Sequence, residues 1–454
     1  MKIAFHTLGC KVNQYETEAI KEAFVSRGAE IVADDEFADA YIINTCTVTN
    51  IADRKSRQFI RRMKSINPDA VVVVTGCYAQ VKPEEIKAMD EVDIVIGNNY
   101  KSQICDIVID RISYADTDCL TCGDNKYSMV SPTSQLTSYE DMGITTAAES
   151  GKTRAYIKIQ DGCDRYCSYC LIPYARGRVR SRSVNDVLAE AESLITKGYK
   201  EIVLTGINTA MYGRERDFAL DLSDDTDAQP LELLISKIND IPGDFRIRLS
   251  SLEPTVVDSD DVERIIKYDK LCKHLHLSVQ SGSDNVLKRM NRRYTRTEYM
   301  DIVSAIRKHY PLYGITTDII VGFPGETESD FNYSLDIVKK SEFIKVHAFR
   351  YSPRTGTKAA EMQDKVDGVT SHERAEKLEK LSETVSAEFR KKNTGICHRV
   401  LTEQEEGDYI TGYTGNYIKV YLEKTPTTPI GEFVDVIITE IYRDGCKGRI
   451  VGNS

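Results

Sequence analysis

The sequence predicts an α/β protein in three parts: an N-terminal parallel α/β domain, a partial (βα)6 barrel and a small C-terminal β-barrel. Three observations predict this arrangement. Apolar runs alternate with helical patterns over roughly the first 110 residues, six more strand-like runs follow residue 151, and short alternating strands follow residue 395. With 454 residues, the chain has room for about three domains.

The composition is that of an ordinary globular chain with an acidic balance. Hydrophobic residues make up 41%, charged residues 29%, and the formal net charge is −10. An acidic chain must bind nucleic acid through local basic patches, because its overall field repels phosphate. We find no signal peptide and no run of about 18 apolar residues, so we expect a cytoplasmic protein without a membrane span. In that compartment, metal binding explains the twelve cysteines better than disulfides do.

The N-terminal α/β domain is expected over residues 1–112. Each of its first three strands ends in a polar or glycine turn that carries a cysteine. Strands that alternate with helices form a parallel sheet with both faces covered. The predicted strands cover residues 2–10, 40–46, 70–77 and 92–99, and the predicted helices cover 14–27, 52–65 and 82–89.

Residues 113–150 are predicted to be a linker or a mobile insertion. They are rich in Ser, Thr, Asp and Gly and lack periodicity. Cys119 and Cys122 lie here with the spacing of half a metal site or of a redox pair. No partner pair follows them, so the sequence gives little support to a functional role.

The second α/β series is expected over residues 151–385. Six βα units of this kind can form a partial barrel, whose catalytic groups lie on the loops after the strands. The predicted strands cover 154–160, 201–207, 245–251, 274–279, 315–323 and 344–352, and clear helical patterns cover 184–197, 297–309 and 371–393.

The last part, residues 386–454, is predicted to be a small β-barrel of the oligonucleotide-binding kind. After Gly395 the sequence consists of short alternating runs separated by turn residues. The runs cover 398–404, 408–423, 431–442 and 447–452.

Three cysteines stand close together directly after the first strand of the second series. Cys163, Cys167 and Cys170 have the spacing Cys-x3-Cys-x2-Cys. Thiolates suit zinc or iron–sulfur clusters, but a structural zinc site takes four ligands and this loop offers three. A cubane cluster on three cysteines would keep one iron open to a substrate or cofactor. A zinc knuckle or three unrelated thiols is the alternative.

Three further cysteines each fall at the end of a predicted N-terminal strand. They are Cys10, Cys46 and Cys77, far apart in sequence. In an open parallel sheet the carboxyl ends of the strands meet at one edge, so these thiols can converge there. Buried cysteines at strand ends are also common as small apolar residues, and the spacing alone leaves both interpretations open.

The residues around the six cysteines resemble those of the methylthiotransferase family of radical S-adenosylmethionine (SAM) enzymes. The resemblance covers essentially the whole chain, in the family's order of an N-terminal cluster domain, a radical SAM barrel and an RNA-binding TRAM domain. The segments that carry it are TLGCKVNQYE, NTCTVTN, TGCYAQ, DGCDRYCSYC, PYARGRVRSR, LTGIN, HLSVQSGSDNVLKRMNRRYT, TTDIIVGFPGET and FRYSPRTGT.

The resemblance implies two [4Fe–4S] clusters. The cluster on Cys163, Cys167 and Cys170 would bind SAM at its open iron, and an electron passed through it would cleave SAM to a 5′-deoxyadenosyl radical. The cluster on the N-terminal cysteines would handle the sulfur to be transferred. By position, Gly206 resembles the segment that contacts the SAM amino group. Gln280, with Ser281, ends the fourth barrel strand and is expected to face the site, and Arg293 or its neighbour Arg292 could pair with the SAM carboxylate. Each of these residues could also be merely structural.

Three branches of the family differ in substrate, and the opening segment resembles the branch that acts on N6-threonylcarbamoyladenosine beside the anticodon of tRNA, at position 37. The residues that carry this resemblance are Lys11, Val12, Gln14, Tyr15 and Glu16. The implied reaction replaces the C2–H of the adenine with C2–SCH3. The alternatives are methylthiolation of isopentenyladenosine in tRNA, methylthiolation of an aspartate of a ribosomal protein, or a non-catalytic role as an iron–sulfur RNA-binding protein. A flavodoxin or ferredoxin would supply electrons, and a monomer is expected.

Candidate RNA contacts are basic residues near the cysteines and aromatic residues in the last domain. Arg54, Arg57 and Arg61 recur at helical spacing just after Cys46, and could hold phosphates or simply form a solvated face. A second basic set consists of Arg176, Arg178, Arg180 and Arg182. Tyr413, with Tyr409 and Tyr417, could stack on bases or fill the barrel core.

Overall fold

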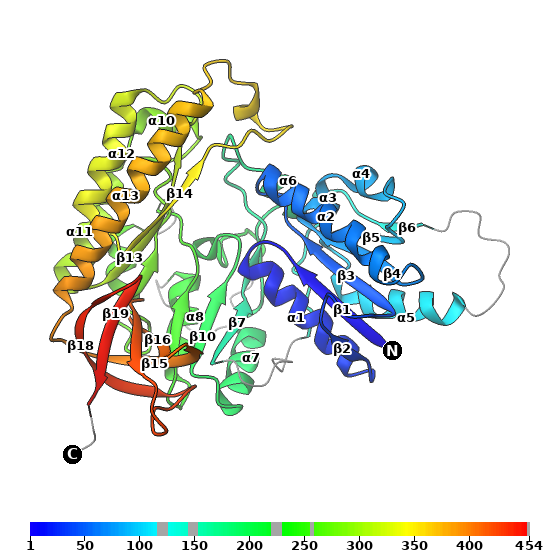
Figure 1. Ribbon diagram of the computed structural model, residues 1–454. Coiled ribbons are helices and arrows are strands. Elements are labelled where there is room, and N and C mark those ends of the chain that lie inside the picture. The colour runs from blue at the N-terminus through cyan, green and yellow to red at the C-terminus, as the bar shows by residue number, and fades with distance from the viewer. Residues whose placement is uncertain (116–125, 144–152, 219–228, 255–257, 452–454) are drawn as a thin grey trace.

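The computed structural model describes residues 1–115, 126–143, 153–218, 229–254 and 258–451. Its N-terminal part is a parallel sheet with the strand order β2-β1-β3-β4-β5-β6 and helices on both faces, as predicted (Figure 1). The strands are β1 (Lys2–Thr7), β2 (Glu30–Val32), β3 (Ala40–Thr45), β4 (Val71–Gly76), β5 (Ile94–Ile96) and β6 (Tyr127–Met129), and the helices are α1 (Lys11–Val25), α2 (Asn50–Ile66), α3 (Cys77–Val81), α4 (Pro83–Lys87) and α5 (Ile104–Ala115).

Apolar side chains from both faces of this sheet form its two cores. Ile60 and Met63 of α2 pack with Val72 and Val74 of β4 on one face. On the other face, Phe24 of α1 belongs to the core formed with α5. Burial on both faces explains why β3 and β4 read as continuous apolar runs in the sequence.

The described part of residues 113–150 departs from the predicted linker in one respect. Tyr127–Met129 forms β6 and pairs in parallel with β5, so this segment extends the N-terminal sheet. A strand of three residues with polar neighbours leaves no periodic pattern in the sequence. Cys119 and Cys122 lie outside the described residues.

The second α/β series forms the predicted partial barrel of six parallel strands. The strands β7-β10-β11 and β12-β13-β14 form two sheets, and a parallel bridge between Leu252 and Leu277 joins them. The strands are β7 (Arg154–Lys158), β10 (Glu201–Thr205), β11 (Arg246–Leu249), β12 (His274–His276), β13 (Gly314–Val321) and β14 (Lys345–Arg350), with the short pair β8 (Gln160–Asp161) and β9 (Arg180–Ser181) beside them.

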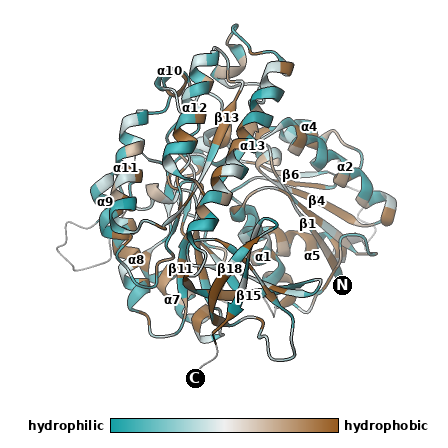
Figure 2. Ribbon diagram, turned by 60° about the vertical axis from the view of Figure 1, so that its left-hand side comes forward, coloured by the Kyte–Doolittle hydropathy of each residue, from teal (hydrophilic) through white to brown (hydrophobic). Residues whose placement is uncertain are grey.

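Helices cover the outside of the partial barrel. They are α7 (Val184–Thr196), α8 (Pro230–Asp240), α9 (Ser259–Ile265), α10 (Asp284–Arg289), α11 (Arg296–His309), α12 (Glu328–Ser341) and α13 (Gly368–Lys392), whereas the short helix α6 (Ile172–Arg176) lies against α3 of the N-terminal domain. Their apolar faces pack on alternate strand residues such as Ile247 and Leu275. Figure 2 shows the resulting division, with brown strands inside and largely teal helices outside. None of the described helices combines the length and the apolar character needed to cross a membrane.

The last part is the predicted small β-barrel, closed in the order β15-β16-β17-β19-β18. It packs against the N-terminal ends of the partial-barrel strands (Figure 1), where the Arg246 and Arg248 guanidinium groups donate to the carbonyl oxygens of Tyr413 and Thr414. Its strands are β15 (Cys397–Glu406), β16 (Tyr409–Thr414), β17 (Lys419–Glu423), β18 (Phe433–Tyr442) and β19 (Gly445–Ile450).

Candidate metal centres

The N-terminal cysteines lie together at one edge of the parallel sheet. Cys10 follows β1, Cys46 follows β3 and Cys77 follows β4, and these three strands are neighbours. Parallel strands end at the same edge, so three positions far apart in sequence meet there. Gly9 permits the close approach: its φ is +107°, and a Cβ at Gly9 would lie 2.8 Å from Cys46 Cβ.

Burial controls the protonation of the Cys46 thiol. It raises the pKa of Cys46 to about 12, and the neighbouring Cys77 adds to the rise. The free thiol of Cys46 is therefore protonated at neutral pH. A metal or cluster that binds there must displace this proton, so loading of the site releases acid.

A buried arginine contacts the third of these cysteines. Arg176 is fully buried, and its Nε lies 3.4 Å from Cys77 Sγ. Its Nη1 donates to Glu16 Oε1 at 2.7 Å and to Asp161 Oδ2 at 3.1 Å. Burial alone would lower the pKa of Arg176, but Asp161 and Glu16 hold it well above its usual value. A permanent positive charge therefore stands beside the thiol of Cys77.

Two lysines complete this buried ion-pair network. Lys158 Nζ lies 2.9 Å from Glu16 Oε1 and 2.6 Å from Asp161 Oδ2, and Lys101 pairs with Glu16. Burial would raise the pKa of Glu16, but Arg176, Lys101 and Lys158 together hold it well below its usual value. Because the N-terminal domain supplies Glu16 and Lys101 and the barrel supplies the other members, the network joins the two domains.

A second buried arginine joins the domains beside Cys46. Arg354, in the loop after β14, donates through Nη2 to Asp53 Oδ2 at 2.6 Å and to Thr47 Oγ1 at 2.7 Å. Thr47 directly follows Cys46, so this contact fixes the loop that carries the cysteine. Arg354 and Asp53 are 301 positions apart, and no local pattern in the sequence could predict their pairing.

The barrel cysteines occupy the loop between β8 and α6. Backbone hydrogen bonds fix this loop: the Cys163 N–H donates to Gly177 O, and the Cys170 N–H donates to Cys167 O, each at 3.0 Å. Burial raises the pKa of both Cys163 and Cys170 to about 12. At Cys170, the thiols of Cys167 and Cys163 contribute to the rise, so the three side chains lie within electrostatic reach of one another.

Both sets of cysteines fit iron–sulfur clusters better than single metal ions. Over the part of the chain that the structure describes, no three His, Cys, Asp or Glu side chains are arranged to hold one metal ion. A cubane accepts each thiolate on a different iron, so its ligands stand further apart than those of a single ion. Thiolate sulfur is also the donor that these clusters require.

Two of the predicted SAM contacts lie at strand ends of the barrel. Gly206 follows β10 and packs against Gln160: a Cβ at Gly206 would lie 2.9 Å from Gln160 Oε1. Gln280 follows β12, is buried, and has a φ of +62°. That conformation is uncommon for a residue other than glycine and is typical of functional sites.

The third predicted SAM contact, Arg293, does not lie at the cysteine loop. Arg293 is exposed, whereas Arg292 points to the loop and donates to Tyr169 Oη at 2.8 Å and to Glu253 Oε1 at 3.0 Å. Of the two arginines, the structure therefore places Arg292 against the cysteine loop. The sequence alone does not show which of two consecutive residues in the turn after α10 faces that loop. Sequence reasoning also missed Glu253, although a carboxylate just after a barrel strand is a usable signal.

The predicted basic stripe on α2 is only partly exposed. Arg54 and Arg61 lie on the surface. Arg57 instead donates to Tyr78 Oη at 2.8 Å and pairs with Glu85 at 3.2 Å. Two of the three predicted phosphate contacts on this helix are therefore free to meet an anionic ligand.

The second basic set alternates between buried and exposed positions. Arg178 is exposed, but Arg176, Arg180 and Arg182 are buried. Arg180 donates to backbone carbonyl oxygens, and Arg182 pairs with Glu190. The interpretation of all four as one basic surface is therefore wrong, because Arg178 is the one exposed member of this set.

Tyr413 lies in the interface between the two barrels. Its ring stacks on Tyr417, with the ring centres 5.1 Å apart, and the Arg154 guanidinium lies 4.8 Å from its centre. Its carbonyl oxygen accepts a hydrogen bond from Arg246. These contacts are at odds with the predicted role in base stacking, because the ring already packs on the neighbouring domain.

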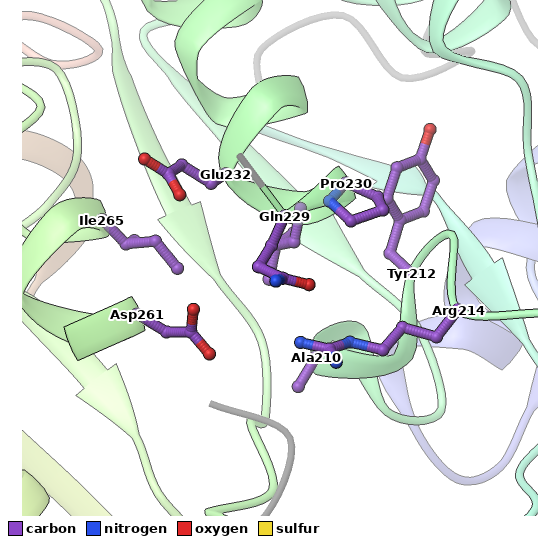
Figure 3. A pocket seen from close by; sticks show the side chains of 9 residues that line it. Ala210, Tyr212, Arg214, Gln229, Pro230, Glu232, Asp261 and Ile265 are labelled. Carbon is purple, nitrogen blue, oxygen red and sulfur yellow. The ribbon is translucent and has the colours of Figure 1, made fainter. Parts of the chain in front are cut away.

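The pocket in Figure 3 lies apart from both cysteine sets. Its lining comes from α8, α9 and the loop after β10, including Tyr212, Pro230 and Asp261. Its volume of about 10 Å³ is room for roughly one water molecule. This pocket therefore takes no part in the candidate site.

Comparison with known proteins agrees with this three-part description. Models match for the Radical SAM superfamily over residues 157–338, the TRAM domain over 399–451, and the uncharacterized protein family UPF0004 over 2–97. The solved structure of the radical S-adenosylmethionine methyltransferase TsrM from Kitasatospora setae, with cobalamin and a [4Fe–4S] cluster bound, has the same fold. Its TM-score is 0.54 at 15% identity, covering 78% of this chain and 76% of that one. The chain is thus a radical SAM enzyme with two further domains.

Relatives along the full length define the family. The chain is 40% identical to the threonylcarbamoyladenosine tRNA methylthiotransferase MtaB of Bacillus subtilis, over 99% of this chain and 97% of the relative. It is 36% identical to MtaB of Aquifex aeolicus, over 96% and 100%. A tRNA-2-methylthio-N(6)-dimethylallyladenosine synthase of Clostridium botulinum is 35% identical, over 95% and 93%. The chain belongs to the family of radical SAM methylthiotransferases, whose cofactors are SAM and two [4Fe–4S] clusters.

Proposed function

We propose that this enzyme methylthiolates C2 of N6-threonylcarbamoyladenosine at position 37 of tRNA. The C2–H bond is replaced by a C2–S bond, and the sulfur would be carried by the auxiliary cluster, where one SAM would supply its methyl group. One-electron reduction of a second SAM would give methionine and a 5′-deoxyadenosyl radical, which would take the C2 hydrogen atom and leave as 5′-deoxyadenosine. When bound, the clusters and SAM supply this electron-transfer and radical chemistry. The work of the chain's own residues is to hold these groups and the adenine in place.

The junction between the two cysteine sets is the observation that carries this proposal. Arg176 contacts both Cys77 Sγ and the Asp161 carboxylate. Asp161 also accepts the Gly162 N–H at 2.8 Å, and Gly162 precedes Cys163. A continuous chain of buried contacts thus connects a ligand of one proposed cluster to a ligand of the other. Sulfur insertion requires both centres near one substrate atom, and this junction favours such an arrangement.

The proposed ligands of the SAM cluster are Cys163, Cys167 and Cys170, and those of the auxiliary cluster are Cys10, Cys46 and Cys77. Gly206 and Gln280 lie at the ends of strands that surround the SAM loop and are the proposed SAM contacts, with Arg292 in place of Arg293. Arg292 is held against the loop by Tyr169 and Glu253. These side chains orient SAM and exclude water from the site.

The proposed partner is the anticodon loop of tRNA, where a splayed base can enter the site. Arg54, Arg61 and Arg178 are the exposed cations for its phosphates, and the match to the TRAM domain supports an RNA ligand. A reduced flavodoxin or ferredoxin is the proposed electron donor. We further propose that the enzyme is a monomer. We also propose that it acts in the cytoplasm, where tRNA and reduced clusters occur together.

The test uses anaerobically reconstituted enzyme and anticodon stem-loop RNAs that differ only at position 37. With SAM and a reductant, we expect methylthiolation of the threonylcarbamoyladenosine RNA and none with Cys163→Ala. Activity confined to the isopentenyladenosine RNA, or to a ribosomal-protein aspartate, would refute the proposed substrate. RNA binding by wild-type enzyme without any turnover of SAM would indicate the non-catalytic alternative.

A further inference from the structure

Lys11 is a cation that forms no ion pair with any of the residues that the structure describes. It is the first residue of α1, directly after Cys10, and its side chain is largely covered. Its Nζ lies 6.0 Å from the centre of the Tyr156 ring, on β7 of the partial barrel. Among the described residues it makes no hydrogen bond or ion pair. An enclosed charge of this kind is costly unless a ligand pairs with it.

The inner face of the partial barrel lies opposite Lys11. Alternate residues of each strand point away from the apolar core, and on β11 and β12 these are Arg246, Arg248, His274 and His276. Tyr156, over which Lys11 lies, is in register with Val203 and Arg248 across β7, β10 and β11. Arg248, Arg154 and Glu201 are the charged groups whose fields reach Lys11. The N-terminal domain therefore places a lysine over the polar interior of the barrel.

Two groups on that face carry buried nitrogens that have no hydrogen-bond partner among the described residues. Arg248, only 2% exposed, donates Nε and Nη2 to Glu201 at 2.9 and 3.0 Å, but its Nη1 has no hydrogen-bond partner in the described part of the chain. His274, 4% exposed, has its Nε2 against Thr316 Oγ1 and its Nδ1 unpartnered. Buried donors are almost always satisfied, so the Nη1 of Arg248, which can only donate, indicates a missing acceptor.

The local charges specify the sign of that ligand. Glu201 is already shared by Arg154, Arg246 and Arg248. Glu403 is a second carboxylate there and pairs with Arg154. Two negative charges thus face three arginines, and Lys11 adds a fourth cation. An anion with hydrogen-bond acceptors fits this surplus of positive charge, whereas a cation or an apolar group does not.

We propose that Lys11 and Arg248 form an anion site that binds the carboxylate of the threonylcarbamoyl group of the substrate. This inference rests on the proposed function and deepens it, because it names the residues that select that substrate. The carboxylate is the one charged group that distinguishes this nucleoside from an isopentenyl nucleoside. A carboxylate on a flexible arm can reach the interior of the barrel, whereas a backbone phosphate stays with the sugar outside it.

The test is a double-mutant cycle between the protein and the RNA. Two anticodon stem-loops are made, one with the natural threonylcarbamoyl carboxylate and one with a neutral primary carboxamide in its place. Their dissociation constants are measured for reconstituted wild-type enzyme, Lys11→Gln and Lys11→Arg. Lys21→Gln is the matched control, because it removes a lysine of the same helix whose partner is Glu18. Melting temperatures show whether each variant is folded.

For the wild type we expect the carboxylate RNA to bind about ten- to a hundred-fold more tightly than the carboxamide RNA, as one charge-assisted hydrogen bond provides. In Lys11→Gln this preference disappears because only the affinity for the carboxylate RNA falls. Lys11→Arg restores most of it, and Lys21→Gln retains it.

Two results would overturn the inference. An undiminished preference in Lys11→Gln would show that Lys11 does not meet the carboxylate, and an equal loss for both RNAs would assign Lys11 to a phosphate. A parallel assay measures methylthiolation of the carboxylate RNA by the wild type. This assay distinguishes a failure of the anion site from a failure of the proposed function. If the wild type modifies the RNA while Lys11→Gln keeps its preference, only the anion site is wrong.

Discussion

The Nε of Arg176 lies 3.4 Å from Cys77 Sγ, and the same guanidinium group donates to Glu16 and Asp161. One fully buried side chain thus touches a proposed ligand of the auxiliary cluster and the segment that leads into the SAM loop. The two carboxylates fix the orientation of the guanidinium group, and its positive charge faces sulfur.

Arg176→Met should lower the reduction potential of the auxiliary cluster. An N–H donor and a positive charge beside a cluster sulfur stabilise the reduced, more negative state, so their loss makes reduction harder. A redox titration followed by electron paramagnetic resonance measures this shift. Arg399→Gln is a suitable control, because Arg399 is exposed and pairs with Asp244 in another part of the chain. An unchanged reduction potential would contradict this prediction and would mean that Arg176 only packs beside the cluster.

The same substitution should also destabilise the junction of the first two domains. It leaves Glu16 and Asp161 buried with fewer cationic partners, and breaking a buried ion pair costs about 3–5 kcal/mol. Urea unfolding of the apo-protein, monitored by circular dichroism, tests this expectation. A loss below about 1 kcal/mol would mean that Lys101 and Lys158 suffice to hold both carboxylates.

Arg354→Ala should loosen the loop that carries Cys46. Asp53 would remain buried without its cation, so we expect a loss of about 3–5 kcal/mol and fewer irons retained after gel filtration. Adding Asp53→Asn removes the uncompensated charge and should recover part of the stability. If the double variant is no more stable than Arg354→Ala, the two residues are not coupled as the structure indicates.

Arg178→Ala should change the affinity for RNA, whereas Arg182→Ala should change the stability of the protein. Arg178 is exposed, so its loss should weaken RNA binding and reduce the salt dependence of log Kd by about 1, without a change in melting temperature. Arg182 is buried against Glu190, so its loss should lower the melting temperature. Binding isotherms at several salt concentrations and thermal melts of both variants check the pair.

Tyr413→Ala should affect stability and leave the intrinsic affinity for RNA unchanged. The ring loses its stacking on Tyr417 and its contact with the Arg154 guanidinium, together worth about 1–3 kcal/mol. Tyr413→Phe keeps both contacts and should resemble the wild type. A large loss of RNA affinity with an unchanged melting temperature would restore the original expectation of base stacking.

The sequence predicted those features that depend on local periodicity or on general rules of topology. The positions of Cys10, Cys46 and Cys77 at one sheet edge followed from alternating strands and helices, because the ends of parallel strands always gather. The barrel set of cysteines could be predicted without any knowledge of the topology, because Cys163, Cys167 and Cys170 are close together in the sequence. The six-stranded partial barrel and the small C-terminal barrel could be predicted because their strands show a local periodicity in the sequence.

Contacts between domains could not be predicted in this way. Arg176 and Arg178 occupy similar positions in one basic segment of the sequence, yet Arg176 is fully buried and Arg178 is exposed. Only the packing of the domains determines which side chains of this segment face the interior. The exchange of Arg293 for Arg292 has the same origin. The partners of Arg354 and Tyr413 lie on other domains, so their roles depend on how the domains meet.

The central claim is that one chain holds two cubane clusters on two sets of three cysteines. Iron and sulfide are counted in anaerobically reconstituted wild-type protein and in the triple variant Cys10→Ala/Cys46→Ala/Cys77→Ala. We predict about eight irons per chain in the wild type and about four in the variant, with the remaining cluster still bound by Cys163, Cys167 and Cys170. About four irons in both proteins would contradict the claim, because the N-terminal cysteines would then hold no cluster.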